Sequence, residues 1–196
     1  MEQDQLREIV AWLTAGFIGW IGVYAVYSSY KNKVRAVAVS PRRATPWQKT
    51  LLVTAVILDG YLIARASNPI LDQWAMAQAS PAPWFAIAMM VAGGGLMIVT
   101  HLHMGASWRI GVPKKDGDIA ALVTTGPHGF SRNPIYLGIM VMLAGAALAA
   151  PGPLTISAVA LTFIGFQSII AEEEAYLTRQ FGDNYANYKK RVRRWL

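Results

Sequence analysis

Long apolar blocks separated by polar loops dominate the pattern of this chain. The blocks fall at about residues 9–30, 50–66, 84–103, 134–149 and 153–171. The first block contains no charged residue and, at about 1.5 Å per helical residue, is long enough to cross the hydrocarbon core of a bilayer. The last two blocks are slightly short, and the tight connection between them at 150–153 predicts a helical hairpin. The pattern therefore predicts an all-α integral membrane protein with five transmembrane helices, the last two forming that hairpin.

The basic residues predict the orientation of these helices. Lys and Arg gather in the loops at 31–49 and 101–132 and in the tail after Arg179, whereas the connections at 67–83 and 150–153 contain none. Because cytoplasmic loops carry the excess of Lys and Arg, we expect the N-terminus outside and the C-terminus in the cytoplasm. The end of the chain, from about Tyr185, is expected to form a basic amphipathic helix on the cytosolic membrane surface. The expected location is a bacterial or archaeal inner membrane.

Composition narrows the classes of function. The 196 residues, of which 54% are hydrophobic and 15% charged, are expected to form one domain spanning 1–196. The net charge of +7 comes from residues that flank apolar blocks, so it indicates topology signals and lipid headgroup contacts rather than a nucleic-acid partner. The absence of cysteine excludes disulfides, thiolate zinc sites and a cysteine nucleophile. His101 and His103 lie two residues apart and do not share a helix face, so no metal site is expected.

A polar motif precedes the fourth apolar block. It contains His128, Arg132 and Asn133, followed at once by Pro134. Proline is favoured in the first turn of a helix, and the free N–H groups of a helix N-terminus can bind a carboxylate. Two interpretations stay open: these donors bind a small polar ligand beside an apolar cavity, or they cap the helix and anchor it to headgroups.

A second polar motif, Glu172–Glu174, follows the fifth apolar block on the same predicted side of the membrane. Three consecutive acids point in different directions around a helix, so only one or two can face a common site. They either accept hydrogen bonds from a ligand or oppose the helix dipole. We expect the two motifs to form opposite walls of one water-accessible pocket that opens to lipid. Asp59, within the second block, is either functional or paired with a neighbour such as Arg65.

The sequence Gly-Pro-His-Gly-Phe-Ser-Arg-Asn-Pro-Ile-Tyr at 126–136, the apolar hairpin and the acidic motif with its basic tail resemble a known family. They are similar to the isoprenylcysteine carboxyl methyltransferases and the related phospholipid methyltransferases, over about residues 105–192. The resemblance implies an integral membrane methyltransferase that uses S-adenosylmethionine without a Rossmann domain. It implies a lipid-like methyl acceptor, and it leaves the oligomeric state open.

The resemblance also implies site residues. The backbone of 120–123 is expected beside the adenine, Asn133 to Tyr136 near the methionine part and the sulfonium, and Glu173 on a polar group of the cofactor. The expected cofactor-binding residues are Ala120, Ala121, Leu122, Val123, His128, Asn133, Pro134, Ile135, Tyr136 and Glu173. The expected catalytic residues are Arg132, which neutralises or orients charge at the reacting end, and His128 and Glu172, which with Glu173 are candidate bases.

Two positions depart from the family pattern and leave the acceptor open. Asn133 stands where the family has the His of an Arg-His-Pro segment, and it cannot serve as a proton base. Ile169 stands where the eukaryotic carboxyl methyltransferases carry an Arg that meets the substrate carboxylate. An isoprenylcysteine-like carboxylate, a lipid amine and a phenolic lipid all remain as acceptors. The alternatives of another class are a non-catalytic membrane scaffold or lipid-binding protein and a related membrane reductase.

Overall fold

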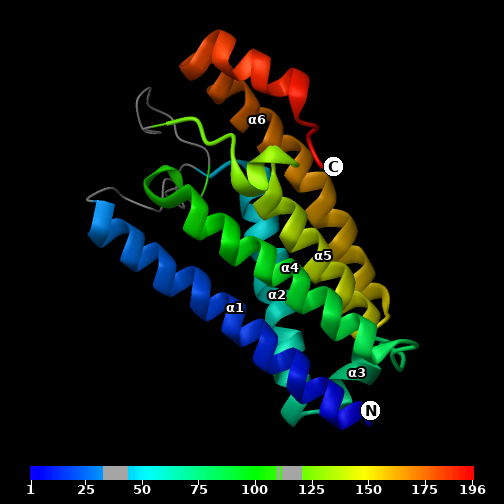
Figure 1. Ribbon diagram of the computed structural model, residues 1–196. Helices are drawn as coiled ribbons and strands as arrows, with labels where there is room; N and C mark the ends of the chain where they lie inside the picture. Colours follow the sequence, from blue (N-terminus) through cyan, green and yellow to red (C-terminus); the bar gives the residue numbers. More distant parts are fainter. Residues whose placement is uncertain (33–43, 110, 112–120) are drawn as a thin grey trace.

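The computed structural model describes residues 1–32, 44–109, 111 and 121–196, and Figure 1 shows these elements as a bundle of helices. Every regular element in these ranges is helical, which confirms the all-α prediction. The elements are α1 (Gln3–Asn32), α2 (Pro46–Ser67), α3 (Ile70–Trp74), α4 (Pro83–Met104), the 3-10 turns η2 (Gly105–Ser107) and η3 (Gly126–Gly129), α5 (Pro134–Ala149) and α6 (Pro153–Arg191).

Four helices in the described part of the chain are long and apolar enough to cross a membrane. These candidate spans are Gln3–Lys31, Pro46–Ser67, Pro83–Ser107 and Pro153–Arg191. Helix α5 is equally apolar but has only 16 residues. A fifth crossing therefore stays a prediction, because at about 1.5 Å per residue α5 is shorter than the core of a bilayer.

Prolines define where four of the helices begin. α2, α4, α5 and α6 each have a proline in the first turn, at positions 46, 83, 134 and 153. Proline fits there because its fixed φ is helical and its missing N–H would have had no partner within the helix. These starts matter for the site, because α5 begins directly after the polar motif at 128–133.

Glycines allow α4 and α5 to pack backbone to backbone. A Cβ atom on Gly138 of α5 would lie 2.6 Å from the carbonyl oxygen of Gly93 in α4, and one on Gly145 would lie 2.7 Å from that of Ala86. Such close approach needs small residues at the interface. α5 packs more extensively on α4 than on α6, to which residues 150–152 connect it. The hairpin prediction considered only the α6 partner, because the glycine match with α4 is not local in sequence.

An ion-pair network holds the end of the bundle that carries the N-terminus. Asp72 of α3 accepts hydrogen bonds from Arg65 Nε (2.7 Å), Arg65 Nη2 (2.9 Å), Arg7 Nε (2.8 Å) and the Tyr61 hydroxyl (2.8 Å). These contacts tie α1, α2 and α3 together. Arg65 is fully buried and pairs with Asp72, not with Asp59.

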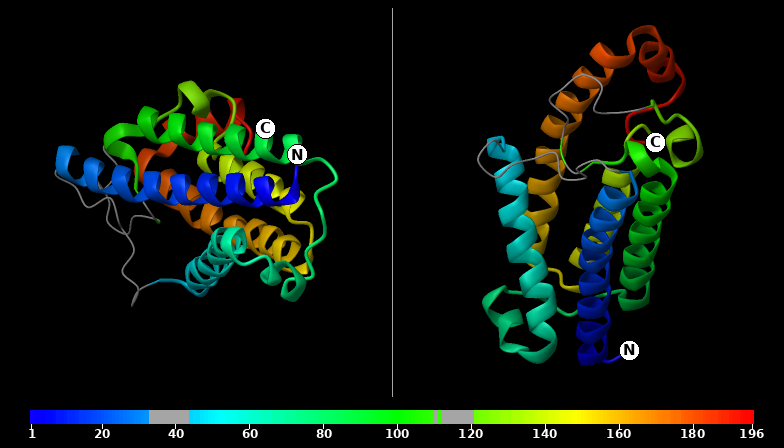
Figure 2. Two further views of the ribbon diagram at one scale, coloured as in Figure 1. Left: turned by 90° about the horizontal axis from the view of Figure 1, so that it is seen from below. Right: turned by 90° about the vertical axis from the view of Figure 1, so that its left-hand side faces the viewer.

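Helix α6 extends well beyond the predicted end of the fifth span. It continues through the acidic motif and bends at Gly182, where φ is +49° and ψ is −124°. Only a residue without a Cβ adopts this conformation readily. In Figure 2 the end of α6 arches over the end of the bundle opposite the N-terminus, and the chain after Arg191 returns toward α5. The predicted amphipathic helix is thus the final segment of α6 after the bend.

Candidate active site

Two adjacent cavities lie at the end of the bundle opposite the N-terminus. The larger, of about 230 Å³, is lined by Ile21, Met97, His101, Met104, Ser107, Trp108, Arg109, Gly111, His128, Arg132, Asn133, Pro134, Ile135, Tyr136, Ile139 and Glu173. The smaller, of about 50 Å³, is lined by Met104, Ser107, Ala121, Leu122, Val123, His128, Arg132, Glu173, Leu177, Tyr185 and Tyr188. The two cavities share five residues, so they are neighbouring chambers with a common wall.

A hydrogen bond joins the two polar motifs across the larger cavity. The hydroxyl of Tyr136, in the first turn of α5, donates to Glu173 Oε2 of α6 at 3.2 Å. Both side chains line that cavity. The structure thus brings together the segment 133–136 and the Glu173 carboxylate, which the sequence places 37 residues apart.

The three consecutive acids occupy three environments. Glu172 is exposed and lines neither cavity, Glu173 is half-buried and lines both, and Glu174 is buried. Successive residues of a helix are rotated by about 100°, so one triplet can point to lipid or water, to a cavity and to a neighbouring loop. Because Glu172 lines neither cavity, the described geometry gives no support to the expectation that it acts as a base, and that expectation stays a prediction.

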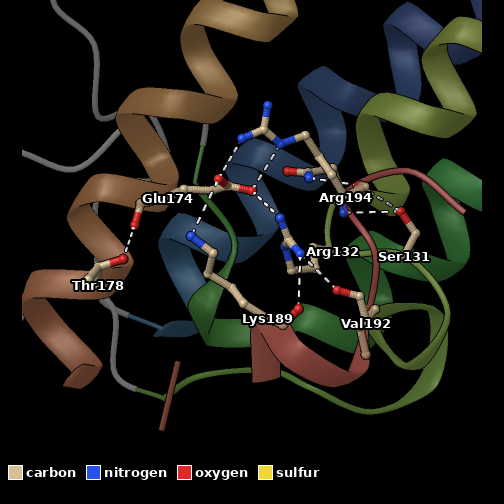
Figure 3. Close-up of polar contacts among 8 residues, drawn as sticks. Ser131, Arg132, Glu174, Thr178, Lys189, Val192 and Arg194 are labelled. Atoms are coloured by element: carbon tan, nitrogen blue, oxygen red, sulfur yellow. Dashed lines mark hydrogen bonds and ion pairs between the residues drawn. The ribbon is translucent and has the colours of Figure 1, made fainter. Parts of the chain in front are cut away.

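Glu174 forms a charged cluster with Arg132 and Arg194. Its Oε1 accepts from Arg132 Nη2 at 2.7 Å, and its Oε2 accepts from Arg194 Nη2 at 2.7 Å (Figure 3). Lys189 lies at 4.0 Å from the same carboxylate. The pKa of the Arg194 guanidinium is raised, mainly by its hydrogen bond to Glu174. Glu174 therefore serves this cluster and lines neither cavity.

Two buried nitrogen atoms on the common wall lack a hydrogen-bond partner among the described residues. They are Nδ1 of His128 and Nε of Arg132. Burial, followed by the nearby His103, lowers the pKa of His128 to about 4, so its ring is neutral at pH 7. A buried polar atom without a partner costs about 1–3 kcal/mol, which a polar ligand group would offset. These two atoms mark the position where such a group fits.

The smaller chamber lies between the segment 121–123 and two tyrosines near the end of α6. Residues 121–123 line it, and Ser107 Oγ donates to the carbonyl oxygen of Ala121 at 3.1 Å. On the opposite side, Tyr188 donates its hydroxyl proton to the carbonyl oxygen of His128 at 2.7 Å. Ala120, expected beside the adenine, lies outside the described residues.

Asn133 contributes to the site through the C-terminal tail. Its Nδ2 donates to the carbonyl oxygen of Arg194 at 2.9 Å, and its backbone N–H donates to Ser131 Oγ at 3.1 Å. The side chain therefore fixes the loop before α5 instead of capping the helix. Pro134, Ile135 and Tyr136 follow in the first turn and line the larger cavity.

Sequence reasoning did not find the aromatic cluster that packs around His101 and Trp108, two residues that line the larger cavity. Trp20 Nε1 donates to His101 Nδ1 at 3.1 Å, the ring of Tyr24 stacks on His101 at 5.4 Å, and Trp108 lies 4.7 Å from it. Because Nδ1 of His101 accepts a hydrogen bond, its neutral ring carries the proton on Nε2. Trp20 and Tyr24 come from α1 and meet α4 only in the folded bundle, so no local signal could have shown this.

The described residues contain no group of three His, Cys, Asp or Glu side chains that could hold a metal ion. The arrangement instead offers a neutral imidazole, a guanidinium, a carboxylate and tyrosines beside an apolar wall. Such a site suits a small polar ligand next to an apolar one, in the way that most ligand pockets combine apolar lining with a few polar groups.

Proteins of known function are similar in sequence to this chain. Protein-S-isoprenylcysteine O-methyltransferase of rat is 31% identical over 107 residues, which are 54% of this chain and 38% of that protein. The fission yeast protein of the same name is 31% identical over 110 residues, 55% of this chain and 46% of that protein. The chain thus spans less than half of the length of these curated relatives.

A solved structure shares the fold. The eukaryotic intramembrane Ras methyltransferase, isoprenylcysteine carboxyl methyltransferase, superposes with a TM-score of 0.58 at 19% identity, covering 92% of this chain and 64% of that one. With the apolar helices, this likeness identifies an integral membrane protein. The profile of the phospholipid methyltransferase family matches residues 82–184, which is more than half of the chain and includes α4, α5, both polar motifs and the bend of α6. The chain therefore belongs to the phospholipid methyltransferase family.

Proposed function

We propose that this protein transfers a methyl group from S-adenosylmethionine to a membrane-soluble acceptor at the cytosolic face. The observation that carries the proposal is the common wall of the two cavities. There the unpartnered Nδ1 of His128 and Nε of Arg132 lie with the Glu173 carboxylate on the wall that the two chambers share. Family membership and the names of the relatives support methyl transfer.

The residues present fit this cofactor. A carboxylate such as Glu173 can accept hydrogen bonds from hydroxyl or ammonium groups, and the Nε–H of Arg132 can donate to a carboxylate. The backbone at 121–123 and the rings of Tyr185 and Tyr188 can hold a planar base in the smaller chamber. When bound, the cofactor supplies a methyl group already activated on a sulfonium.

Positioning supplies much of the rate in such a reaction. The donor needs no further activation, so the chain has to align the acceptor atom with the methyl group and exclude water. The first turn of α5 and the Tyr136–Glu173 hydrogen bond fix two sides of the chamber in which the acceptor atom would lie. The guanidinium of Arg132 and the carboxylate of Glu173 set the charge around it.

The apolar part of the larger cavity indicates a lipid-like acceptor. Ile21, Met97 and Ile139 present hydrocarbon to the chamber from α1, α4 and α5. The relatives' name supports an isoprenylcysteine-like carboxylate, which would need no base. An amine or phenol would first lose a proton, and Glu173 and the neutral ring of His128 are the bases that reach the chamber. Glu172 has no part in this proposal.

The orientation is part of the proposal. The basic residues Lys189, Lys190 and Arg191 lie at the end of the bundle that carries the cavities. By the positive-inside rule this end faces the cytoplasm, where the soluble cofactor is available. The acceptor would reach the same chamber from the bilayer.

Isothermal titration of the purified protein with S-adenosylhomocysteine tests the proposal. We expect binding by the wild-type protein and its loss in Glu173→Gln, while Glu172→Gln, which removes the same charge one residue away, binds normally. Labelled S-adenosylmethionine incubated with vesicles of a bacterial lipid extract then identifies the acceptor by mass spectrometry. A wild-type protein that binds no S-adenosylhomocysteine would leave a non-catalytic scaffold as the better description.

A further inference from the structure

The last five residues of the chain return to the loop that precedes α5. The backbone N–H of Arg132 donates to the carbonyl oxygen of Arg193 at 2.9 Å, and Asn133 Nδ2 donates to that of Arg194 at 2.9 Å. The ring of Trp195 stacks on Phe163 of α6 at 5.9 Å. The tail, defined here as residues 192–196, therefore packs on the side of the loop 131–133, whose Arg132 and Asn133 line the larger cavity.

Both terminal nitrogens of the Arg132 guanidinium are bound, one to this tail and one to Glu174. Its Nη1 donates to the carbonyl oxygen of Val192 at 2.8 Å, and its Nη2 donates to Glu174 Oε1 at 2.7 Å. Nε is the one guanidinium nitrogen of Arg132 with no partner in the described part of the chain. Because a guanidinium is planar and rigid, fixing its two terminal nitrogens also fixes the direction of Nε–H.

The carboxylate of Glu174 that binds Arg132 is itself bound by Arg194. Arg194 donates to both carboxylate oxygens, from Nη2 at 2.7 Å and from Nε at 3.2 Å. This two-point contact restricts rotation of the carboxylate, which a single charge would not do. Figure 3 shows the Glu174 carboxylate between the two guanidinium groups, one from the tail and one from the site loop.

We propose that Glu174 and Arg194 are positioning residues, through which the C-terminal tail aims the free Nε–H of Arg132 at the ligand of the shared cavity wall. The inference rests on the proposed function for the identity of that ligand. The tail lines neither cavity, but it holds the guanidinium of Arg132, which lines both. Loss of Arg194 is expected to weaken cofactor binding more than it changes turnover.

Amide hydrogen exchange tests, without any ligand, whether the tail holds the loop before α5 in place. In Arg194→Ala, the amide of Arg132 and its neighbours in the 128–136 segment should exchange about tenfold faster than in wild type, because the acceptor carbonyl on the tail becomes mobile. Arg193→Ala is the matched control. It removes the same charge from the adjacent residue, whose side chain is exposed and whose backbone carbonyl alone takes part in the contact.

Titration with S-adenosylhomocysteine tests whether the position of Arg132 affects ligand affinity. We expect the Kd to rise about tenfold in Arg194→Ala, the effect of losing about one charge-assisted hydrogen bond. Arg193→Ala should bind as wild type does, and Arg194→Lys should fall between, since lysine restores the charge without the two-point geometry. In the methyl-transfer assay the KM for the donor should rise while kcat stays within about threefold of wild type.

The outcomes separate the two proposals. If wild type binds S-adenosylhomocysteine and Arg194→Ala binds it equally well, the positioning role is overturned while the proposed function stands, even if the unfolding temperature falls. If wild type does not bind, the proposed function fails and the positioning role fails with it.

Adding Glu174→Gln to Arg194→Ala should raise the Kd little beyond the effect of the single change, because both residues act through Arg132. Full additivity would contradict the shared pathway.

Discussion

The hydroxyl of Tyr136 donates to the carboxylate of Glu173 across 3.2 Å, and this bond joins the first turn of α5 to α6. It occupies Oε2 of Glu173, and we expect Oε1 to be available to the proposed ligand. Since both side chains line the larger cavity, the bond also fixes the width of that chamber at its polar end.

Removing this hydroxyl should weaken the proposed reaction without abolishing it. In Tyr136→Phe the ring remains packed on Phe166, at 4.6 Å between centroids, but the carboxylate loses one donor. We expect kcat/KM for methyl transfer to fall by about 5- to 20-fold, the size of one hydrogen bond. Steady-state assays with the labelled donor measure this. Tyr30→Phe, at an exposed position of α1, is the control. An unchanged Tyr136→Phe enzyme would remove the hydroxyl from the site.

The buried His128 should make stability depend on pH. Its pKa is lowered from 6.5 to about 4, so the unfolded chain binds more protons than the folded one between these values. The contribution is therefore fully present above pH 6.5 and is lost as the pH falls toward 4, by at most about 3 kcal/mol. Unfolding in detergent at pH 4.5 and pH 7 measures it. His128→Asn should show a smaller difference between the two pH values, and an identical difference would contradict the buried neutral ring.

The backbone contact between α4 and α5 should not tolerate a methyl group. In Gly138→Ala the new Cβ would lie 2.6 Å from the carbonyl oxygen of Gly93, so the helices must separate. Overpacking of this kind costs about 1–3 kcal/mol. Thermal unfolding of the purified protein measures the loss. Gly95→Ala is the control, because nothing lies within 4 Å of its Cβ position. Equal melting temperatures for the two variants would contradict the contact.

The network around Asp72 should support stability without touching the site. Burial raises the pKa of Asp72, but hydrogen bonds from Arg65, Tyr61 and Arg7 outweigh it and hold the pKa below its usual value. Asp72→Asn leaves a fully buried guanidinium uncompensated and should cost about 3–5 kcal/mol. Chemical unfolding measures this, with Glu8→Gln, which removes an exposed charge outside the network, as control. The folded fraction should bind S-adenosylhomocysteine as wild type does, since the network lies at the other end of the bundle.

Local signals in the sequence were enough to place most elements. Pro134 correctly indicated where α5 begins, because proline in a first turn is a property of a few neighbouring residues, and the apolar block at 153–171 indicated where α6 begins. The span to 171 was too short a description of α6, since charged residues end an apolar block without ending a helix. Gly182, followed by Asp183 and Asn184, was the available signal for the bend.

Contacts between distant segments could not be derived in the same way. The acidic triplet offered three equivalent carboxylates, and only the rotation of α6 against the site loop separates Glu173 from Glu174. Arg194 was hidden in a run of basic residues, where nothing distinguishes it from Arg193 until the tail folds back. Arg65 lies on α2, and its partner Asp72 lies on the next helix, α3.

Because α6 bends at Gly182, the number of residues after the bend determines where the C-terminal tail begins and which way it faces. Between the bend and Val192 the chain has a fixed number of residues, and each one turns the segment by about 100° and advances it by about 1.5 Å. One alanine inserted after Asn187 would rotate the rest of the helix and the tail that follows it, so Arg194 would lose its position beside Glu174 although no native residue is replaced. The number of residues between the bend and the tail, as much as their identity, therefore determines whether Arg194 reaches Glu174 beside Arg132.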